Sequence, residues 1–428
     1  MDFSLGAPCV ITPAPLWLRR QTQPDLPKNG FVTWLLSGLS AVLFLPQEKM
    51  IYSRPKFNLI HKALVGAVVL CLSQAASAVE VSPHFHSWGG SLMEAKQSAG
   101  MTSATLAFAV TRGNCALVPS FINKLPEARN YVASGGRLLL SFGGTDGIYA
   151  EIACRDDNQL FALMEKVMED AGTRRLDFDI EGHQLLNTEG TARRARVLAR
   201  LQAKYPDLYV SFSLPGWLRG FNPPAIDLLN TTQNAGVRID MVNVMTQSFG
   251  VENLRTMVVP STVGQASVMA FQATANQMAG IFRNKTQPQL YAMMGFTPMI
   301  GKNDDGSTFT LDDARTVADF AKSNGVGLIS YWSFQRDRAQ ATNGSNDLNS
   351  FTGVAQSNYE FHSIFKSAGN SVTSASTQAC NGSTWTQGRQ YAAGSIVSYQ
   401  DGNVYIAKFA NPGYNPTIST YFWSRHTC

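Results

Sequence analysis

The sequence predicts an α/β protein, a (β/α)8 TIM barrel over residues 79–366 that is followed by a separate small domain over residues 380–428. Eight apolar, strand-like runs alternate with helical stretches over about 290 residues, as a barrel of eight βα units requires. Residues 367–379 carry no charged or aromatic side chain and are mostly Ser, Thr, Ala and Gly, which is typical of a flexible linker. Residues 380–428 contain nine aromatic and only four charged residues, so we treat them as a module of their own.

The predicted strands are runs of mostly apolar residues, and the intervening stretches Leu160–Ala171 and Thr191–Tyr205 have the periodicity of amphipathic helices. A doubly wound sheet shows the same alternation, but it usually carries a Gly-rich phosphate loop near its start. The nearest stretch in this chain, Gly295–Lys302, has five residues between its glycines instead of four, so a barrel is favoured. The eight runs are VEVSPHF (79–85), SATLAFAV (103–110), RLLLSFGG (137–144), RLDFDIEG (175–182), LYVSFSL (208–214), IDMVNVM (239–245), QLYAMMGF (289–296) and GLISYWSF (327–334).

The positive charge of the chain is concentrated in its first 78 residues. The 428 residues are 44% hydrophobic and 15% charged, a composition that excludes a disordered protein. The formal net charge is +5, but residues 1–78 hold seven Lys or Arg against three Asp or Glu. The remaining residues hold 28 basic and 27 acidic side chains, which argues against a nucleic-acid partner.

Residues 50–78 have the pattern of a secretory signal peptide. After Met50 come basic residues, then an apolar run, and then the small residues Ala76 to Ala78 that are typical of a cleavage site. We therefore expect cleavage near Ala78 and a secreted protein with no membrane partner after processing. Residues 1–49 are then an over-long N-terminal extension, with Met50 as the true first residue; a genuine N-terminal anchor is the alternative.

Four cysteines follow the predicted signal peptide, and an even number in an exported protein predicts disulfide bonds. Four cysteines allow three pairings, and the sequence does not choose among them. The simplest pairing joins neighbours, Cys115 with Cys154 and Cys380 with Cys428. The second bond would stabilise the small domain by roughly 3–4 kcal/mol. No C-x-x-C spacing or histidine cluster accompanies the cysteines, and the sequence predicts neither a metal site nor a cofactor.

Three acidic residues alternate along the fourth predicted strand. Successive side chains of a strand point to opposite faces, so Asp177, Asp179 and Glu181 share one face while apolar residues share the other. If the apolar face packs against the helices, three carboxyls lie inside the barrel, and a shared proton raises the pKa of at least one of them. Glu181 comes last, where barrel active sites open, and is therefore predicted as a general acid. A solvated sheet face and an acidic metal site are the alternatives.

This strand resembles the signature D-x-x-D-x-D-x-E of family 18 glycoside hydrolases, the chitinases. Asp177, Asp179 and Glu181 match its last three acids, whereas Arg174 occupies the place of the first. Three other stretches support the resemblance, and the order and spacing agree over residues 79–366. These stretches are SFGG (141–144), DMVNVM (240–245) and SYWS (330–333).

The resemblance implies a retaining, substrate-assisted hydrolysis of β-1,4-linked N-acetylglucosamine polymers. In that mechanism Glu181 would protonate the glycosidic oxygen and Asp179 would orient the 2-acetamido group of the substrate. Asp177 would share a proton with Asp179, and Trp332 would form the apolar floor of the site. The substrate-binding residues implied in this way are Trp332, Gln247, Met245 and Gly144. The histidines of the first strand, His84 and His86, are expected as rim or subsite residues and not as metal ligands.

The sixth predicted strand departs from the family pattern, which usually reads Met-x-Tyr-Asp. Gln247 stands in the place of the tyrosine and Ser248 in the place of the aspartate. The Gln247 amide can still donate a hydrogen bond to an acetamido oxygen, whereas Ser248 cannot supply a negative charge. We therefore expect an active enzyme that is slower, or tuned to an unusual pH or substrate.

The tail resembles a small all-β chitin-binding module of carbohydrate-binding families 5 and 12. We expect Trp385, Tyr391 and Trp423 in its core. The rings expected to stack on sugars are Phe409, Tyr414 and Tyr405. The whole sequence therefore predicts a secreted, monomeric chitinase whose partner is chitin or another glycan that contains N-acetylglucosamine. An endo-β-N-acetylglucosaminidase acting on glycoproteins and a catalytically impaired chitin-binding protein are the alternatives.

Overall fold

The computed structural model describes residues 78–250, 262–340, 347–369, 383–392, 394–408, 411–419 and 422–426. The expectations for residues 1–77, for the linker beyond residue 369, and for Phe409, Cys380 and Cys428 lie outside this range. Within the described residues, no helix combines the length and the apolar character that a membrane span requires. The barrel and the tail are described separately below.

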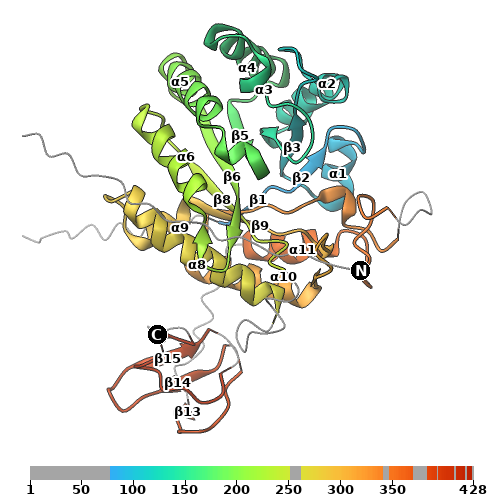
Figure 1. Ribbon diagram of the computed structural model, residues 1–428. Coiled ribbons are helices and arrows are strands. Elements are labelled where there is room, and N and C mark those ends of the chain that lie inside the picture. The colour runs from blue at the N-terminus through green and yellow to red at the C-terminus, as the bar shows by residue number, and fades with distance from the viewer. Residues whose placement is uncertain are drawn as a thin grey trace, which may run out of the picture. The chain divides into compact units, whose positions relative to one another are not determined.

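Eight strands form one parallel sheet that closes on itself (Figure 1). Its strands are β1 (Glu80–Val81), β2 (His84–His86), β3 (Ser103–Ala109), β4 (Arg137–Gly143), β5 (Arg175–Asp179), β6 (Tyr209–Trp217), β8 (Met241–Met245), β9 (Met294–Thr297) and β12 (Leu328–Ile329). β1 and β2 are two parts of the first strand: β1 pairs with β12, and β2 pairs with β3. Between them the Pro83 carbonyl accepts from Thr105, and the His84 N–H donates to Tyr331. The first strand thus bonds both of its neighbours, which closes the predicted barrel.

Helices pack outside the sheet, as Figure 1 shows for α4, α5 and α6 beside β5 and β6. The predicted helices at 160–171 and 191–205 are confirmed as α4 and α5. Asp156 caps α4 by accepting from the N–H groups of Asn158 and Gln159, and Gly172 ends the helix at a φ of 69°. The helices are α1 (Leu92–Ala99), α2 (Pro119–Ala133), α3 (Ala150–Ala153), α4 (Asp157–Ala171), α5 (Thr188–Lys204), α6 (Pro223–Asn234), α8 (Val263–Ile281), α9 (Gln287–Ala292), α10 (Leu311–Asn324) and α11 (Glu360–Gly369), with 3-10 turns η1 (Gly182–Leu186) and η2 (Phe334–Arg336).

The predicted seventh strand is wrong in its first half, because residues 289–292 belong to helix α9. The Gln289 side chain accepts from the Thr286 N–H at 2.8 Å, and Pro288 stands in the first turn, so this apolar run begins inside a capped helix. β9 starts only at Met294. Helix α11 also continues to Gly369, which is beyond the expected end of the barrel domain at residue 366.

The two faces of β5 are as predicted from the alternation of its residues. Leu176 and Phe178 are buried in the apolar core, and the Arg194 guanidinium of α5 lies 5.8 Å from the Phe178 ring. Asp177 and Asp179 are buried on the other face. Small polar side chains surround them inside the barrel, which leaves room for the carboxyls and supplies hydrogen-bond donors. These buried residues are Ser82, Thr105, Ser141, Ser211, Ser213, Asn243 and Ser330.

Two smaller features complete the described structure. Cys115 and Cys154 form a disulfide, which confirms one bond of the simplest pairing. Three short strands accompany the barrel, β7 (Gly220–Phe221) beside β6 and the pair β10 (Gly301–Lys302) and β11 (Thr308–Phe309).

The tail contains a four-stranded sheet in the order β13 (Ser383–Thr384), β14 (Ile396–Ser398), β15 (Val404–Ala407) and β16 (Trp423–His426). Tyr391 and Trp423 are buried in its core and Trp385 packs against them, as expected. Of the rings predicted to bind sugars, Tyr414 is 53% exposed and Tyr405 is half-buried. The Tyr405 hydroxyl donates to Asp401 at 2.6 Å, which fixes its ring.

Candidate active site

A cavity of about 600 Å³ opens where the barrel strands end. Five of the predicted site residues line it, although they come from the ends of β5 and β8, the residues just after those strands and the segment after β12: Asp179, Glu181, Met245, Gln247 and Trp332. Asp177 lies one inward-facing position deeper on β5 and is fully buried. The structure therefore brings together most of the residues that the sequence assigned to one site.

Asp177 is held by hydroxyl groups from both neighbouring strands. The β4–β5 register sets Ser141 opposite Asp177, and the Ser141 hydroxyl donates to Asp177 Oδ2 at 2.8 Å. From β6, the Ser213 hydroxyl donates to Asp177 Oδ1 at 3.1 Å. Two donors suit a carboxylate that is fully removed from water, because each satisfies one of its oxygens.

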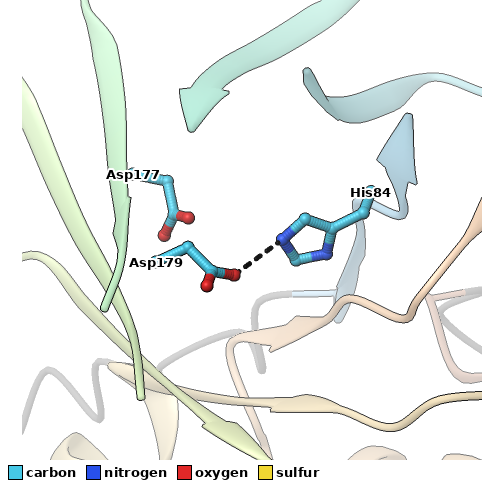
Figure 2. Close-up of side chains that lie close together, drawn as sticks. All are labelled: His84, Asp177 and Asp179. Carbon is cyan, nitrogen blue, oxygen red and sulfur yellow. Dashed lines mark ion pairs between the residues drawn. The ribbon is translucent and has the colours of Figure 1, made fainter. Parts of the chain in front are cut away.

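Asp179 faces His84 across the barrel interior (Figure 2). Asp179 Oδ2 lies 3.4 Å from His84 Nε2, and His84 Nδ1 lies 3.0 Å from the Ser330 hydroxyl. Burial raises the pKa of Asp179 well above its usual range, and the charge of Asp177 adds to this effect. Burial lowers the pKa of His84, although Asp177 and Glu181 oppose that shift. Of the two expected positions, His84 takes the subsite and not the rim, because the residue is only 1% exposed and lines the cavity from inside the barrel.

Glu181 stands at the mouth of the site, just after the end of β5. Its backbone N–H donates to the Tyr149 hydroxyl at 3.1 Å, and Thr145 Oγ1 donates to its Oε1 at 3.1 Å. Burial raises the pKa of Glu181 to about 8, with a further contribution from the neighbouring carboxyl of Asp179. The side chain therefore carries a proton at neutral pH while it lines an open cavity, as a general acid requires.

Gly143 and Gly144 allow β4 to approach β5 closely. Gly143 has a φ of 118°, and a Cβ there would lie 1.9 Å from the Asp179 carbonyl oxygen. Gly144 donates its N–H to that same oxygen at 2.9 Å. Gly144 packs against Phe108 and does not line the cavity, so the expectation that it binds substrate is wrong. Its contribution is the hydrogen bond to the end of β5. The Tyr149 hydroxyl, which the sequence analysis missed, lies 3.0 Å from the Asp179 carbonyl oxygen.

Aromatic rings form one wall of the cavity around Trp332. The Phe108 ring is stacked on Trp332 at 5.5 Å with an interplanar angle of 4°. His86 lies 4.8 Å from Trp332 and is itself stacked with Trp88, whose side chain is 55% exposed. His86 is buried behind these rings and does not line the cavity, so the expectation of a rim or subsite residue is wrong for His86. Sequence reasoning missed Phe108 and Trp88 because isolated aromatic residues at strand ends are common in barrel cores.

Gln247 lines the cavity, in the inward orientation that the alternation along β8 predicts. Its Oε1 atom is buried and has no hydrogen-bond partner in the described structure. The next residue, Ser248, has a φ of 53°, an uncommon conformation for a residue other than glycine. The backbone therefore turns at Ser248, and the side-chain oxygen of Gln247 is left without a hydrogen-bond partner among the described residues.

Among the described residues, one group could offer three metal-ligating atoms, namely His84, Asp177 and Asp179, whose ligand atoms lie within 4.8 Å of one another. Both oxygens of Asp177 already accept from hydroxyl groups, and burial favours the protonated form of Asp179 through its raised pKa. Metal ligands must be deprotonated, so the preference of Asp179 for its protonated form argues against a resident cation. Asp179 Oδ1 and His84 Nε2 have no hydrogen-bond partner among the described residues.

Comparisons with known proteins agree with this geometry, although no family model matches the chain. A probable bifunctional chitinase/lysozyme of Escherichia coli is 28% identical over 279 residues, which are 61% of this chain and 31% of that protein. Endochitinase 11 of Metarhizium anisopliae is 29% identical over 211 residues, which are 48% of this chain and 40% of that protein. The chain thus spans less than half the length of either relative.

Solved structures match the barrel more completely. The catalytic domain of a hyperthermophilic chitinase from Pyrococcus furiosus has a TM-score of 0.60 and 26% identity, covering 68% of this chain and 95% of that domain. Catalytic-site mutants of active domain 2 of a Pyrococcus furiosus chitinase, complexed with chito-oligosaccharides, give a TM-score of 0.59 and 25% identity over 68% of this chain and 96% of that one. In both sequence and structure, the barrel of this chain is therefore similar to chitinases and their catalytic domains.

Proposed function

We propose that this protein is a secreted chitinase that hydrolyses β-1,4-linked N-acetylglucosamine polymers with retention of configuration at the anomeric carbon. The observation that carries this proposal is the chain of three carboxyls that ends at Glu181, whose pKa is raised to about 8, inside a cavity walled by Trp332. The similarity of the barrel to chitinases favours chitin as the substrate class.

Glu181 is the proton donor in the proposed mechanism. It is the acidic residue at the end of the carboxyl chain that lines the cavity and is protonated at neutral pH. Its proton passes to the glycosidic oxygen, the bond from that oxygen to the anomeric carbon breaks, and Glu181 becomes a carboxylate. In the second half of the reaction the same carboxylate takes a proton from the attacking water.

The nucleophile in this proposal is the acetamido oxygen of the substrate, which attacks the anomeric carbon. Asp179 is poorly placed to be a protein nucleophile, because it is only 3% exposed and lies at the end of β5 between the deeper Asp177 and Glu181 at the mouth. Its carboxylate would instead accept a hydrogen bond from the acetamido N–H. Gln247 and Met245 line the same cavity and would contact the acetamido group, and Trp332 would support the sugar ring.

We also propose that the signal peptide at residues 50–78 exports the protein and that the tail binds chitin. The exposed Tyr414 ring is stacked on Phe422 at 5.0 Å, which holds it as a flat surface for a sugar. Sugar rings pack on such surfaces through their apolar C–H faces. The tail would then concentrate the enzyme on a solid substrate.

The proposal is tested with the purified protein, the hexamer of N-acetylglucosamine and insoluble chitin. Glu181→Gln should lower the hydrolysis rate by roughly two to four orders of magnitude and leave adsorption to chitin unchanged. Glu189→Gln, on the exposed outer side of the barrel, is the matched control and should keep the parent rate. NMR of the first products should show the β-anomer. A parent that cleaves only glycoprotein glycans would favour the endoglycosidase, and one that binds chitin without any cleavage would favour the impaired binding protein.

A further inference from the structure

We propose that His84 accepts the proton of Asp179 when the substrate binds, and so acts as the positioning residue that holds Asp179 as a carboxylate facing the acetamido group. This inference rests on the proposed function and assigns His84 a role in that reaction. The proposal starts from one contact, the 3.4 Å between His84 Nε2 and Asp179 Oδ2 inside the barrel (Figure 2).

The His84 ring is fixed in place on every side. Its Nδ1 lies 3.0 Å from the Ser330 hydroxyl, and its ring packs at 5.7 Å from Phe108 and 5.9 Å from Trp332. Its Nε2 has no hydrogen-bond partner among the described residues and is directed toward Asp179. A buried nitrogen without a partner is costly, because it has given up its bond to water. A proton placed between Nε2 and Oδ2 would remove that cost.

Charged groups reach His84 from one side of the barrel. Asp177, Asp179 and Glu181 face it from β5 and the residue after that strand, and the negative charge of Asp177 favours its cationic form. The neighbouring strand β3 contributes Thr105, which pairs with His84 in register, and Phe108, neither of which titrates near neutral pH. The segment after β12 contributes Ser330 and Trp332, which also stay neutral.

His86 is the remaining titratable neighbour on the same strand, and burial lowers its pKa to about 3. It is therefore neutral at pH 6 and above, where it adds no charge that would oppose a cationic His84.

The proposed step moves one proton and no other atom. In the free enzyme Asp179 holds the proton and His84 is neutral, in line with the raised pKa of the acid and the lowered pKa of the imidazole. When the acetamido N–H approaches, the O–H bond of Asp179 breaks and an N–H bond forms at His84 Nε2. The pair then consists of a carboxylate, which the acetamido group requires, and an imidazolium beside the carboxyl of Asp177. The total charge of the buried site is unchanged.

Two substitutions separate proton acceptance from packing. His84→Phe keeps a ring against Phe108 and Trp332 but removes both nitrogens. The proton of Asp179 must then leave for solvent, so the low-pH side of the kcat profile on the N-acetylglucosamine hexamer should move to higher pH. We expect kcat at pH 6 to fall at least tenfold while KM changes less than threefold. His84→Gln offers an N–H donor but takes no proton, and it should remain as slow as His84→Phe.

His362→Gln is a matched control. His362 is also buried, its Nδ1 lies 3.1 Å from the Tyr331 hydroxyl, and its Nε2 also lacks a partner, yet no carboxyl is paired with its ring in the described structure. From His362, the Asp337 carboxylate accepts a hydrogen bond only from the backbone N–H. This variant should unfold at a lower temperature without any shift of the pH profile. An unshifted profile in His84→Phe would overturn the proposal, and so would a parent-like kcat in His84→Gln.

A measurement without turnover keeps this test separate from the proposed function. In Glu181→Gln, imidazole nitrogen NMR should show His84 changing from neutral to imidazolium when the trimer of N-acetylglucosamine saturates the site. If the trimer binds and His84 stays neutral, the proton-acceptor role is wrong, whatever the enzyme hydrolyses. If the trimer does not bind at millimolar concentration, the proposed function and the inference that rests on it both fail.

Discussion

The pH dependence of hydrolysis should report the protonation of Glu181. Burial and the neighbouring carboxyl of Asp179 raise the pKa of Glu181 to about 8. The protonated form of Glu181 is the proton donor. Hydrolysis that depends on this proton is therefore present below that pH and is lost as the pH rises through about 8. We therefore expect the high-pH side of the kcat/KM profile, which reports the free enzyme, to fall near pH 8.

Removing one hydrogen bond should move this side of the profile in a defined direction. The Thr145 hydroxyl donates to Glu181 Oε1 at 3.1 Å and favours the ionised form. Thr145→Val removes that donor, so the pKa of Glu181 should rise. Because Thr145 is exposed, we take about 0.5–1 kcal/mol for the bond, at the low end of the usual range. At about 1.36 kcal/mol per pKa unit, the profile should move upward by roughly half a pH unit.

The assay is initial-rate hydrolysis of the N-acetylglucosamine hexamer from pH 4 to pH 10 for the parent, Thr145→Val and a control variant. Thr316→Val is the control, because the Thr316 hydroxyl donates to the Asp312 carbonyl on helix α10 and contacts no catalytic carboxyl. Its profile should match the parent. If the high-pH side of the parent profile lies below pH 6, or if it moves to lower pH in Thr145→Val, Glu181 is not a buried acid with a raised pKa.

Three further predictions concern the cavity, the tail and the disulfide. Gln247→Ala should lower kcat/KM on the hexamer by roughly 1–3 kcal/mol of transition-state stabilisation, because it removes a buried hydrogen-bonding amide; an unchanged kcat/KM would take Gln247 out of the site. Deleting residues 370–428 should weaken adsorption to insoluble chitin and leave hexamer hydrolysis nearly unchanged, whereas equal losses would make the tail part of the catalytic fold. Replacing Cys115 and Cys154 together with Ser should lower the free energy of unfolding by about 2–4 kcal/mol in urea titrations, and an unchanged value would mean that the bond adds no stability.

The fold could be predicted because barrel strands are short and apolar and alternate with amphipathic helices. The prediction failed where composition was ambiguous. Residues 290–296 are mostly apolar, and an apolar run fits a helix as well as a strand over so short a length. The cap at Thr286 and the proline at residue 288 stand just before the run and start a helix there. Attention to these start signals would have moved the strand to Met294.

The carboxyls of the site could be predicted because Asp177, Asp179 and Glu181 are neighbours on one strand, where a period of two fixes their common face. The contact between Asp179 and His84 could not, because it joins residues 95 positions apart across a closed barrel. Local patterns place each side chain on the inner face of its own strand and say nothing about which strand it meets. The contact of Tyr149 could not be predicted for the same reason, since its hydroxyl reaches β5 from the loop after β4.

The replacement of an aspartate by Ser248 bears on how the site holds its substrate. A carboxylate at residue 248 would add one negative charge near the acids of the site, and the serine hydroxyl supplies none. In the proposed mechanism, Asp179 and Glu181 keep their roles, because neither group bonds residue 248 in the described structure. The cost of the serine therefore falls on holding the acetamido group, where Gln247 remains as the amide that lines the cavity.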